Sequence, residues 1–392
     1  MAFESLTALK KIAAPHSGRP LIMTFSHLRW NFVFQRPQHL LTRAARTHDV
    51  MYFEEPVFEP VAKAFLRTTK PSQSISVLTP VLPEGTGASR AIELQRHFVD
   101  STLASCQNDQ RVLWYYTPMA LHFTDHLASD VCVYDCMDEL SAFKNAPREL
   151  VRMEQLLMQR ADVVFTGGLS IYEAKRRQHK SIHPLPSSID TSHFHKARKP
   201  GDDPRDQSSI ARPRIGYFGV IDERLNTELV GDMATKLADV QFIMIGPVVK
   251  IDPAELPRLP NIHWLGSKSY SELPSYLRHW DAGWMPFALN AATRYISPTK
   301  TPEFLAAGLP VVSTAIVDVV RTYGAKGLVE IADQDDMAEK LRLALLPRSP
   351  QLKEKADHYL STMSWEKTWS EMAKHLDKGS SQRNLVPLHA EA

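Results

Sequence analysis

Short apolar segments alternate with amphipathic stretches along most of this chain, and the alternation starts a second time near residue 214. Apolar strands separated by helices are typical of a parallel sheet that helices cover on both faces. Between the two series lies a polar stretch, 196–213, whose content of Pro, Ser and charged residues is that of a linker. A chain of 392 residues is also too long for one hydrophobic core. The sequence therefore predicts an α/β protein with two parallel-sheet domains.

The apolar segments give the expected strands, and the periodicity gives the main helices. The expected strands are 21–25, 50–53, 75–78, 111–115, 131–134, 163–166 and 182–185 in the first half, and 214–218, 241–245, 262–265, 282–285, 311–312 and 328–331 in the second. The clearest expected helices are 38–46, 91–106 and 148–160.

These elements predict a domain plan for the whole chain. Residues 1–195 form the first domain, 196–213 the linker and 214–350 the second domain. Residues 351–378 form terminal helices, broken near Ser364, that we expect to pack back on the first domain, and 379–392 form a disordered tail. Two such domains create a cleft at the carboxyl ends of their strands, where open α/β sheets bind ligands.

Composition excludes several other classes of protein. A net charge of +2 gives no general attraction to polyanions, so we expect no nucleic acid partner. Three cysteines without a paired framework indicate a reducing compartment and buried thiols. No apolar run is long enough to span a bilayer and no secretory signal is visible, so the expected location is cytoplasmic. An amphipathic segment, 1–13, and a basic run, 175–180, leave peripheral contact with the inner membrane open, although a basic run is more often a solvated helix face.

The stretch 294–312 has the most specific chemistry. Thr301 is expected to cap a helix whose first residues are Pro302 and Glu303, and Gly308 to end it in the left-handed conformation. Ser297, followed by a proline, is a second candidate cap, but Pro302 would then lie inside the helix. Arg294 and Lys300 can hold phosphates, and the acceptor-only carboxylate of Glu303 can take both hydroxyls of a ribose. This combination indicates a nucleotide-sugar site.

The same stretch resembles the retaining GT-B glycosyltransferases of family 4, and the segment 26–39 resembles a smaller subset of that family that makes bacterial polysaccharides. Residues 298–312 match that family's donor-site pattern, and the resemblance extends over about 20–375. The segments 214–225, 242–247 and 262–266 resemble its phosphate-facing and base-facing strand ends, and 161–166 and 186–194 its approach between the domains. The resemblance implies two Rossmann-like domains in the GT-B arrangement.

The implied activity is transfer of a sugar from a nucleoside diphosphate to a glycan or lipid-linked acceptor, with retention of configuration. Fixed cations would stabilise the leaving diphosphate, so we expect no cofactor and no metal. The expected catalytic residues are Asp138, Arg224 and Lys300. The expected donor-binding residues are Gly219, Arg224, Gly246, Leu265, Arg294, Ser297, Thr299, Lys300 and Glu303.

An acceptor side is expected at the first strand–helix junction, where the segment 26–39 replaces the usual glycine-rich loop. Pro37 is expected at the first position of a helix, so that free amides and the Arg36 charge face a phosphate or the acceptor. An ordinary packing role for the aromatic and polar residues of this segment is the alternative. The expected acceptor-side residues are His27, Trp30, Arg36, Gln38, His39 and Asp135.

One departure from the family pattern keeps other functions open. Tyr295 stands where many members carry the first of two glutamates. The alternatives are a GT-B nucleotide-sugar epimerase or phosphorylase, and a non-catalytic protein that binds sugar nucleotides as a sensor or scaffold.

Overall fold

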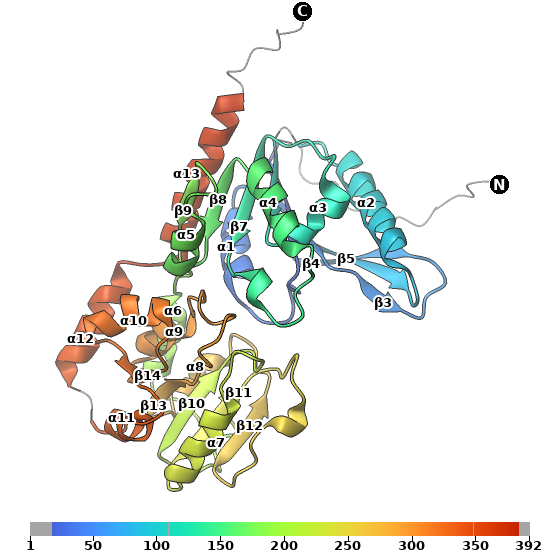
Figure 1. The fold of residues 1–392 in the computed structure, drawn as a ribbon. Helices are drawn as coiled ribbons and strands as arrows, with labels where there is room; N and C mark the ends of the chain where they lie inside the picture. The colour runs from blue at the N-terminus through green and yellow to red at the C-terminus, as the bar shows by residue number, and fades with distance from the viewer. Residues whose placement is uncertain (1–17, 109, 348, 384–392) are drawn as a thin grey trace, which may run out of the picture.

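The computed structural model describes residues 18–108, 110–347 and 349–383, which form two sheet domains (Figure 1). The α/β class with two largely parallel sheets, predicted from the alternation of strands and helices, is confirmed. The N-terminal amphipathic segment 1–13 lies outside the described residues, as does the end of the expected tail, 384–392.

The N-terminal sheet has the strand order β3-β5-β2-β1-β6-β7-β8-β9, and β4 pairs with β5 antiparallel. Its strands are β1 (Leu21–Ser26), β2 (Asp49–Glu54), β3 (Val57–Glu59), β4 (Phe65–Ser72), β5 (Ile75–Pro83), β6 (Arg111–Tyr115), β7 (Val131–Cys136), β8 (Val163–Thr166) and β9 (Ile182–Pro184). Strands β3 and β4 were not predicted, because most of their side chains are at least partly exposed and form no apolar run.

Helices cover both faces of this sheet. Alternate residues of β1, such as Met23 and Ile22, belong to two different cores. Helices α2 to α5 pack on the Met23 side, and α1 and α13 on the Ile22 side. The helices of this half are α1 (Arg36–Ala44), α2 (Ala88–Ala104), α3 (Leu121–Thr124), α4 (Leu150–Arg160) and α5 (Leu169–Lys175), with short 3-10 turns η1 (Pro118–Ala120) and η2 (Leu140–Ala142).

The C-terminal sheet is parallel, with the order β12-β11-β10-β13-β14-β15, and has a single continuous core. Its strands are β10 (Arg214–Phe218), β11 (Gln241–Ile245), β12 (Ile262–Gly266), β13 (Ala282–Met285), β14 (Val311–Ser313) and β15 (Glu330–Ile331). Its helices are α6 (Thr191–Phe194), α7 (Thr227–Lys236), α8 (Leu273–Leu277), α9 (Lys300–Ala307), α10 (Val317–Thr322), α11 (Met337–Ala344) and α12 (Pro350–Ser361), with 3-10 turns η3 (His195–Arg198), η4 (Pro253–Glu255) and η5 (Gly324–Lys326).

The expected linker, 196–213, is not a free connection. Gln207 is fully buried and accepts a hydrogen bond of 2.7 Å from the Trp280 indole. Arg214 and Asp203 form an ion pair of 2.6 Å. Ile189 already belongs to the C-terminal core, so the chain crosses between the domains after β9, within 185–189. The polar composition hid these buried contacts.

The second crossing lies between the last two helices, as the expected break near Ser364 indicated. Helix α13 (Trp365–Arg383) packs on the N-terminal sheet (Figure 1). There the Trp365 ring stacks on His39 with centroids 4.5 Å apart. Helix α12, which was expected to do the same, instead packs on the C-terminal core through Leu360. Helix α13 also includes residues 379–383, which were expected to be disordered.

Candidate functional site

A cavity of about 370 Å³ lies between the two domains, at the carboxyl ends of β7, β10 and β11. This is the position at which open parallel sheets bind ligands. Both domains supply its walls. From the N-terminal half come residues 30–36, Met137, Asp138 and Ser187. From the C-terminal half come residues 217–220, Arg224, 245–247, 267–270, Leu273, Phe287, 296–300 and Glu303.

Helix α9 places its first turn against this cavity, but it begins two residues earlier than expected. Lys300 is its first residue and Thr299 its N-cap, so the expected cap at Thr301 is wrong. Pro302 is tolerated as the third residue because the first amides of a helix have no intrahelical partner. Thr301 is buried, and its hydroxyl lies 3.3 Å from the Met285 sulfur. The expected end is confirmed, since Gly308 has a φ of 89°.

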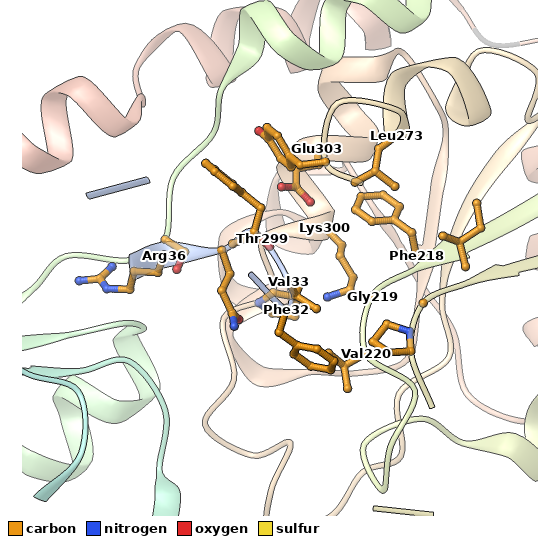
Figure 2. Close-up of a pocket in the computed structure, with 18 of the residues that line it drawn as sticks. Phe32, Val33, Arg36, Phe218, Gly219, Val220, Leu273, Thr299, Lys300 and Glu303 are labelled. Carbon is orange, nitrogen blue, oxygen red and sulfur yellow. The ribbon is translucent and has the colours of Figure 1, made fainter. Parts of the chain in front are cut away.

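Lys300 and Glu303 are the charged groups of this turn, and both side chains point into the space at the centre of Figure 2. Among the residues that the structure describes, neither makes an ion pair within 4.0 Å. Burial raises the pKa of Glu303 to about 8, although Lys300 opposes the shift. Burial also lowers the pKa of Lys300, which Glu303 opposes. The site therefore holds a cation and an acceptor without committed partners.

Two glycines allow the backbone to approach this turn. Gly219 has a φ of 140°, and a Cβ there would lie 2.0 Å from Cε of Lys300. Gly246 has a φ of 148°, and a Cβ there would lie 1.8 Å from the Gly219 carbonyl oxygen. Both conformations and both spaces exclude a side chain. Both glycines line the cavity.

Arg224 lies beside the cavity on the loop after β10 and is held by Asp222. Its Nε and Nη2 lie 2.9 and 2.7 Å from the Asp222 carboxylate, which also accepts the Arg224 backbone amide at 3.0 Å. Asp222 was not predicted, although an Asp two residues before the arginine is the signal of an Asx turn.

Asp138 lines the cavity on the loop after β7, as predicted from its place after a strand. Burial raises the pKa of Asp138, and the nearby positive charges of Arg224 and Arg36 oppose the rise. Asp138 is the acidic residue that the N-terminal half supplies to the described cavity wall.

Arg36 and Asp135, expected on the acceptor side, are committed to each other. The Arg36 Nη2 lies 2.8 Å from Asp135, both side chains are almost fully buried, and Nη1 donates to the Leu185 carbonyl at 2.7 Å. The Arg36 side chain points away from the centre of the cavity in Figure 2. Although part of Arg36 lines the wall, Asp135 does not.

The remaining acceptor-side predictions also separate into residues that line the cavity and residues that do not. Trp30 lines the cavity, but its ring packs on Tyr52 with centroids 5.1 Å apart. Gln38 donates to the Trp30 and Val33 carbonyls and so orders the loop. Burial lowers the pKa of His39 to about 3 and that of His27 to about 4, and neither residue lines the cavity. The packing alternative is therefore the better description of Gln38 and His39.

Two donor-side predictions also fall outside the cavity. Leu265 packs on the C-terminal core and does not line the site. Arg294 is exposed, and its guanidinium lies 5.4 Å from the ring of Tyr295. Tyr295 itself packs against the N-terminal core and lines a second cavity. Ser297 and Thr299, by contrast, line the site as predicted.

Several wall residues were not predicted. Phe32 is 48% exposed and Tyr270 lies on the loop after β12; their rings belong to opposite domains. Lys268, on the same loop, pairs with Asp206 at 2.7 Å. No pattern in the sequence singles out these positions, because the domain arrangement brings them together.

The basic run 175–180 is not a uniform solvated face. Lys175 is buried and lies 2.7 Å from each of two carboxylates, Glu139 and Glu154.

Among the described residues, no group of three or more His, Cys, Asp or Glu side chains could hold a metal ion. Within the same residues, no helix combines the length and apolarity needed to cross a bilayer. Cys132 and Cys136 are buried free thiols, as expected.

Sequence comparison identifies one family and one curated relative. Residues 212–346 match the family described as glycosyl transferases group 1. A Bacillus subtilis (strain 168) protein, TuaH, named as a teichuronic acid biosynthesis glycosyltransferase, is 27% identical over 233 residues. That match covers 54% of this chain and 57% of TuaH, so the chain matches little more than half the length of this curated relative.

Solved structures resemble nearly the whole chain. A trehalose-6-phosphate structure from E. coli bound with UDP-2-fluoro glucose has a TM-score of 0.68 at 12% identity, covering 91% of this chain and 98% of that one. Sucrose-phosphate synthase from Thermosynechococcus elongatus has a TM-score of 0.69 at 13% identity, covering 92% and 99%. The chain thus has the GT-B fold of these structures, and its residues 212–346 are similar to group 1 glycosyl transferases.

Proposed function

We propose that this protein is a glycosyltransferase that uses a nucleoside-diphosphate sugar. The observation that carries the proposal is the first turn of α9, where Lys300 and Glu303 line an interdomain cavity without ionic partners among the described residues. A cation suits the diphosphate and an acceptor-only carboxylate suits the ribose hydroxyls. The match to group 1 glycosyl transferases over 212–346 supports the same conclusion.

Charge stabilisation of the leaving group is the main catalytic device that we propose. Breaking the bond between the sugar C1 and the β-phosphate oxygen leaves negative charge on the diphosphate. Lys300 and Arg224, both on the cavity wall, would stabilise that charge, assisted by the free amides at the start of α9. Because these cations are fixed by the fold, we propose that no divalent metal is required.

We propose that transfer retains the configuration at C1. The acceptor hydroxyl would form its bond to C1 on the side from which the diphosphate leaves, and its proton would pass to a β-phosphate oxygen. Asp138, across the cavity from α9 on the N-terminal wall, would lie near the reacting sugar. This scheme requires no strong protein base.

We propose a glycan or lipid-linked glycan as the acceptor and the cytoplasm, with peripheral contact at the inner membrane, as the location. The assignment of TuaH by name to teichuronic acid biosynthesis supports a bacterial surface glycan. The exposed aromatic ring of Phe32, on the N-terminal wall, is suited to the apolar face of a sugar.

The test is release of nucleoside diphosphate from UDP-, GDP-, dTDP- and ADP-sugars, each with EDTA or with Mg²⁺. We expect one donor to be turned over equally with EDTA and Mg²⁺, slowly by water and faster with an acceptor glycan. A metal requirement that persists at saturating donor would overturn metal independence. Failure of every donor would overturn the proposed activity.

A non-catalytic sugar-nucleotide sensor is the second candidate, and the position of Tyr295 favours it. This residue packs against the N-terminal core instead of facing the cavity, so no carboxylate is supplied from that position. A sensor would bind a nucleotide and release no product, so binding without turnover would select this alternative.

A further inference from the structure

The loop that follows β7 is anchored in both domains. Its first residues include Asp138, on the cavity wall, and Glu139, whose carboxylate lies 2.7 Å from the buried Lys175 ammonium. Lys175 also lies 2.7 Å from Glu154 of α4. The start of the loop is therefore fixed to the N-terminal domain by a buried ion-pair cluster.

The far end of the same loop reaches the C-terminal domain. The ring of Phe143 lies 5.4 Å from the guanidinium carbon of Arg224 and 4.8 Å from Nζ of Lys250. Both distances are within the range at which an aromatic face attracts a cation. Arg224 and Lys250 lie on the loops after β10 and β11, so one N-terminal ring contacts two cations of the donor half.

The contacts of Arg224 leave one donor group free. Its backbone amide, Nε and Nη2 all donate to Asp222. Among the described residues, none accepts a hydrogen bond from Nη1. With one edge of the guanidinium held by Asp222 and a ring beside it, the group is restricted in orientation while Nη1 stays available to a ligand oxygen.

We infer that Phe143 is a positioning residue that holds the Arg224 guanidinium in the orientation needed to bind the diphosphate. The contact links the diphosphate-binding residues of the C-terminal domain to the loop of the N-terminal domain that carries Asp138. The inference rests on the proposed function. Its consequence is that Arg224 is fully ordered only when the two domains are in contact, and that Asp138 and Arg224 are aligned by the same loop.

The pair Phe143→Leu and Phe143→Trp separates the aromatic contact from simple packing. Leucine keeps an apolar side chain but has no π face, whereas tryptophan keeps the face. Binding of UDP, GDP, dTDP and ADP to the full chain is measured by calorimetry, together with the monophosphate of the preferred base. Phe58→Leu, at an exposed aromatic of β3, is the matched control.

We expect Phe143→Leu to lower the affinity for the preferred diphosphate by about three- to thirtyfold and to change the affinity for the monophosphate by less than about twofold. Phe143→Trp and Phe58→Leu should bind both as wild type does. Equal weakening of diphosphate and monophosphate, or no weakening, would overturn the inference. In an Arg224→Ala background, Phe143→Leu should have no further effect, and an undiminished effect there would also overturn it.

The outcomes distinguish the two proposals. If wild type binds none of the four diphosphates, the proposed function fails and the inference fails with it. If wild type binds one and Phe143→Leu binds it equally well, only the role of Phe143 fails.

Discussion

Lys300 and Glu303 in the C-terminal half face the cavity without ionic partners among the described residues, whereas Arg36 and Asp135 in the N-terminal half are buried against each other. All four were predicted as site residues from their charge and their place at strand–helix junctions. The difference shows that tertiary contacts, and not the place of a charged residue at such a junction, decide whether its charge is committed to a protein partner. In the C-terminal half the charges of Lys300 and Glu303 are available for binding, and in the N-terminal half those of Arg36 and Asp135 are committed to each other.

The largest expected effect is on stability, from breaking the acceptor-half pair. Arg36→Ala leaves the Asp135 carboxylate buried without its partner, which should lower the free energy of unfolding by about 3–5 kcal/mol. Denaturant titration measures it, and Arg36→Met with Asp135→Leu should recover much of the loss. A loss below 1 kcal/mol would show that the pair is not structural.

The next effect is on rate, from the donor half. Lys300→Ala removes a fixed cation beside the expected leaving group and should lower the turnover rate by about 10²–10³-fold. The free energy of unfolding should not fall, because Lys300 has no ionic partner to lose among the described residues. Initial rates with the preferred donor measure the effect, with the exposed Lys236→Ala of α7 as control. Equal rates for both variants would place Lys300 outside the chemistry.

A smaller effect is expected from pH. Burial raises the pKa of Glu303 to about 8, so the ionised form that accepts both ribose hydroxyls grows as the pH rises. Nucleotide affinity should therefore increase about tenfold from pH 7 to pH 9, and in Glu303→Gln this increase should disappear. The free energy of unfolding should change in the opposite direction and fall as the pH rises from about 4.5 to about 8. The reason is that the folded protein keeps a proton on Glu303 that the unfolded chain loses above about pH 4.5. Unfolding of the free protein at pH 5 and pH 8 tests the predicted fall in stability. Identical pH profiles of affinity in wild type and Glu303→Gln would exclude a role of ionised Glu303 in nucleotide binding.

The smallest effect is expected at Arg294. This exposed cation lies beside Tyr295 and does not line the cavity, although its sequence position suggested phosphate binding. Arg294→Ala should change nucleotide affinity by less than about twofold, as expected for a surface charge that is screened by solvent. Calorimetry with the preferred nucleotide measures it. A loss of tenfold or more would mean that Arg294 moves into the site when the donor binds.

The sequence predicted most of the fold because apolar strands of a parallel sheet are continuous runs. Strands such as β6, β8, β10 and β11 have the predicted bounds. The exposed hairpin of β4 has no such run, and the polar segment 196–213 concealed Gln207, which is buried by contacts with distant residues. Composition indicates where polar residues lie in the sequence but does not indicate what they pack against.

The candidate site was predictable where one short segment supplies it. Ser297, Thr299, Lys300 and Glu303 come from a loop and the helix turn that follows it, so their spacing alone placed them together. The pairing of Arg36 with Asp135 joins residues 99 positions apart, and the contact of Phe143 with Arg224 joins two domains. Such contacts depend on tertiary structure, which no local pattern reports.

Nucleotide binding by wild type and Glu303→Ala tests the central claim most directly. Thermal unfolding of both proteins is followed with UDP, GDP, dTDP and ADP, in EDTA. A ligand at 100 times its dissociation constant stabilises by about 2.7 kcal/mol, which a melting curve resolves. We predict that one diphosphate stabilises wild type without metal and that Glu303→Ala loses this effect. If no diphosphate shifts wild type, or if Glu303→Ala responds as wild type does, the first turn of α9 is not the donor site.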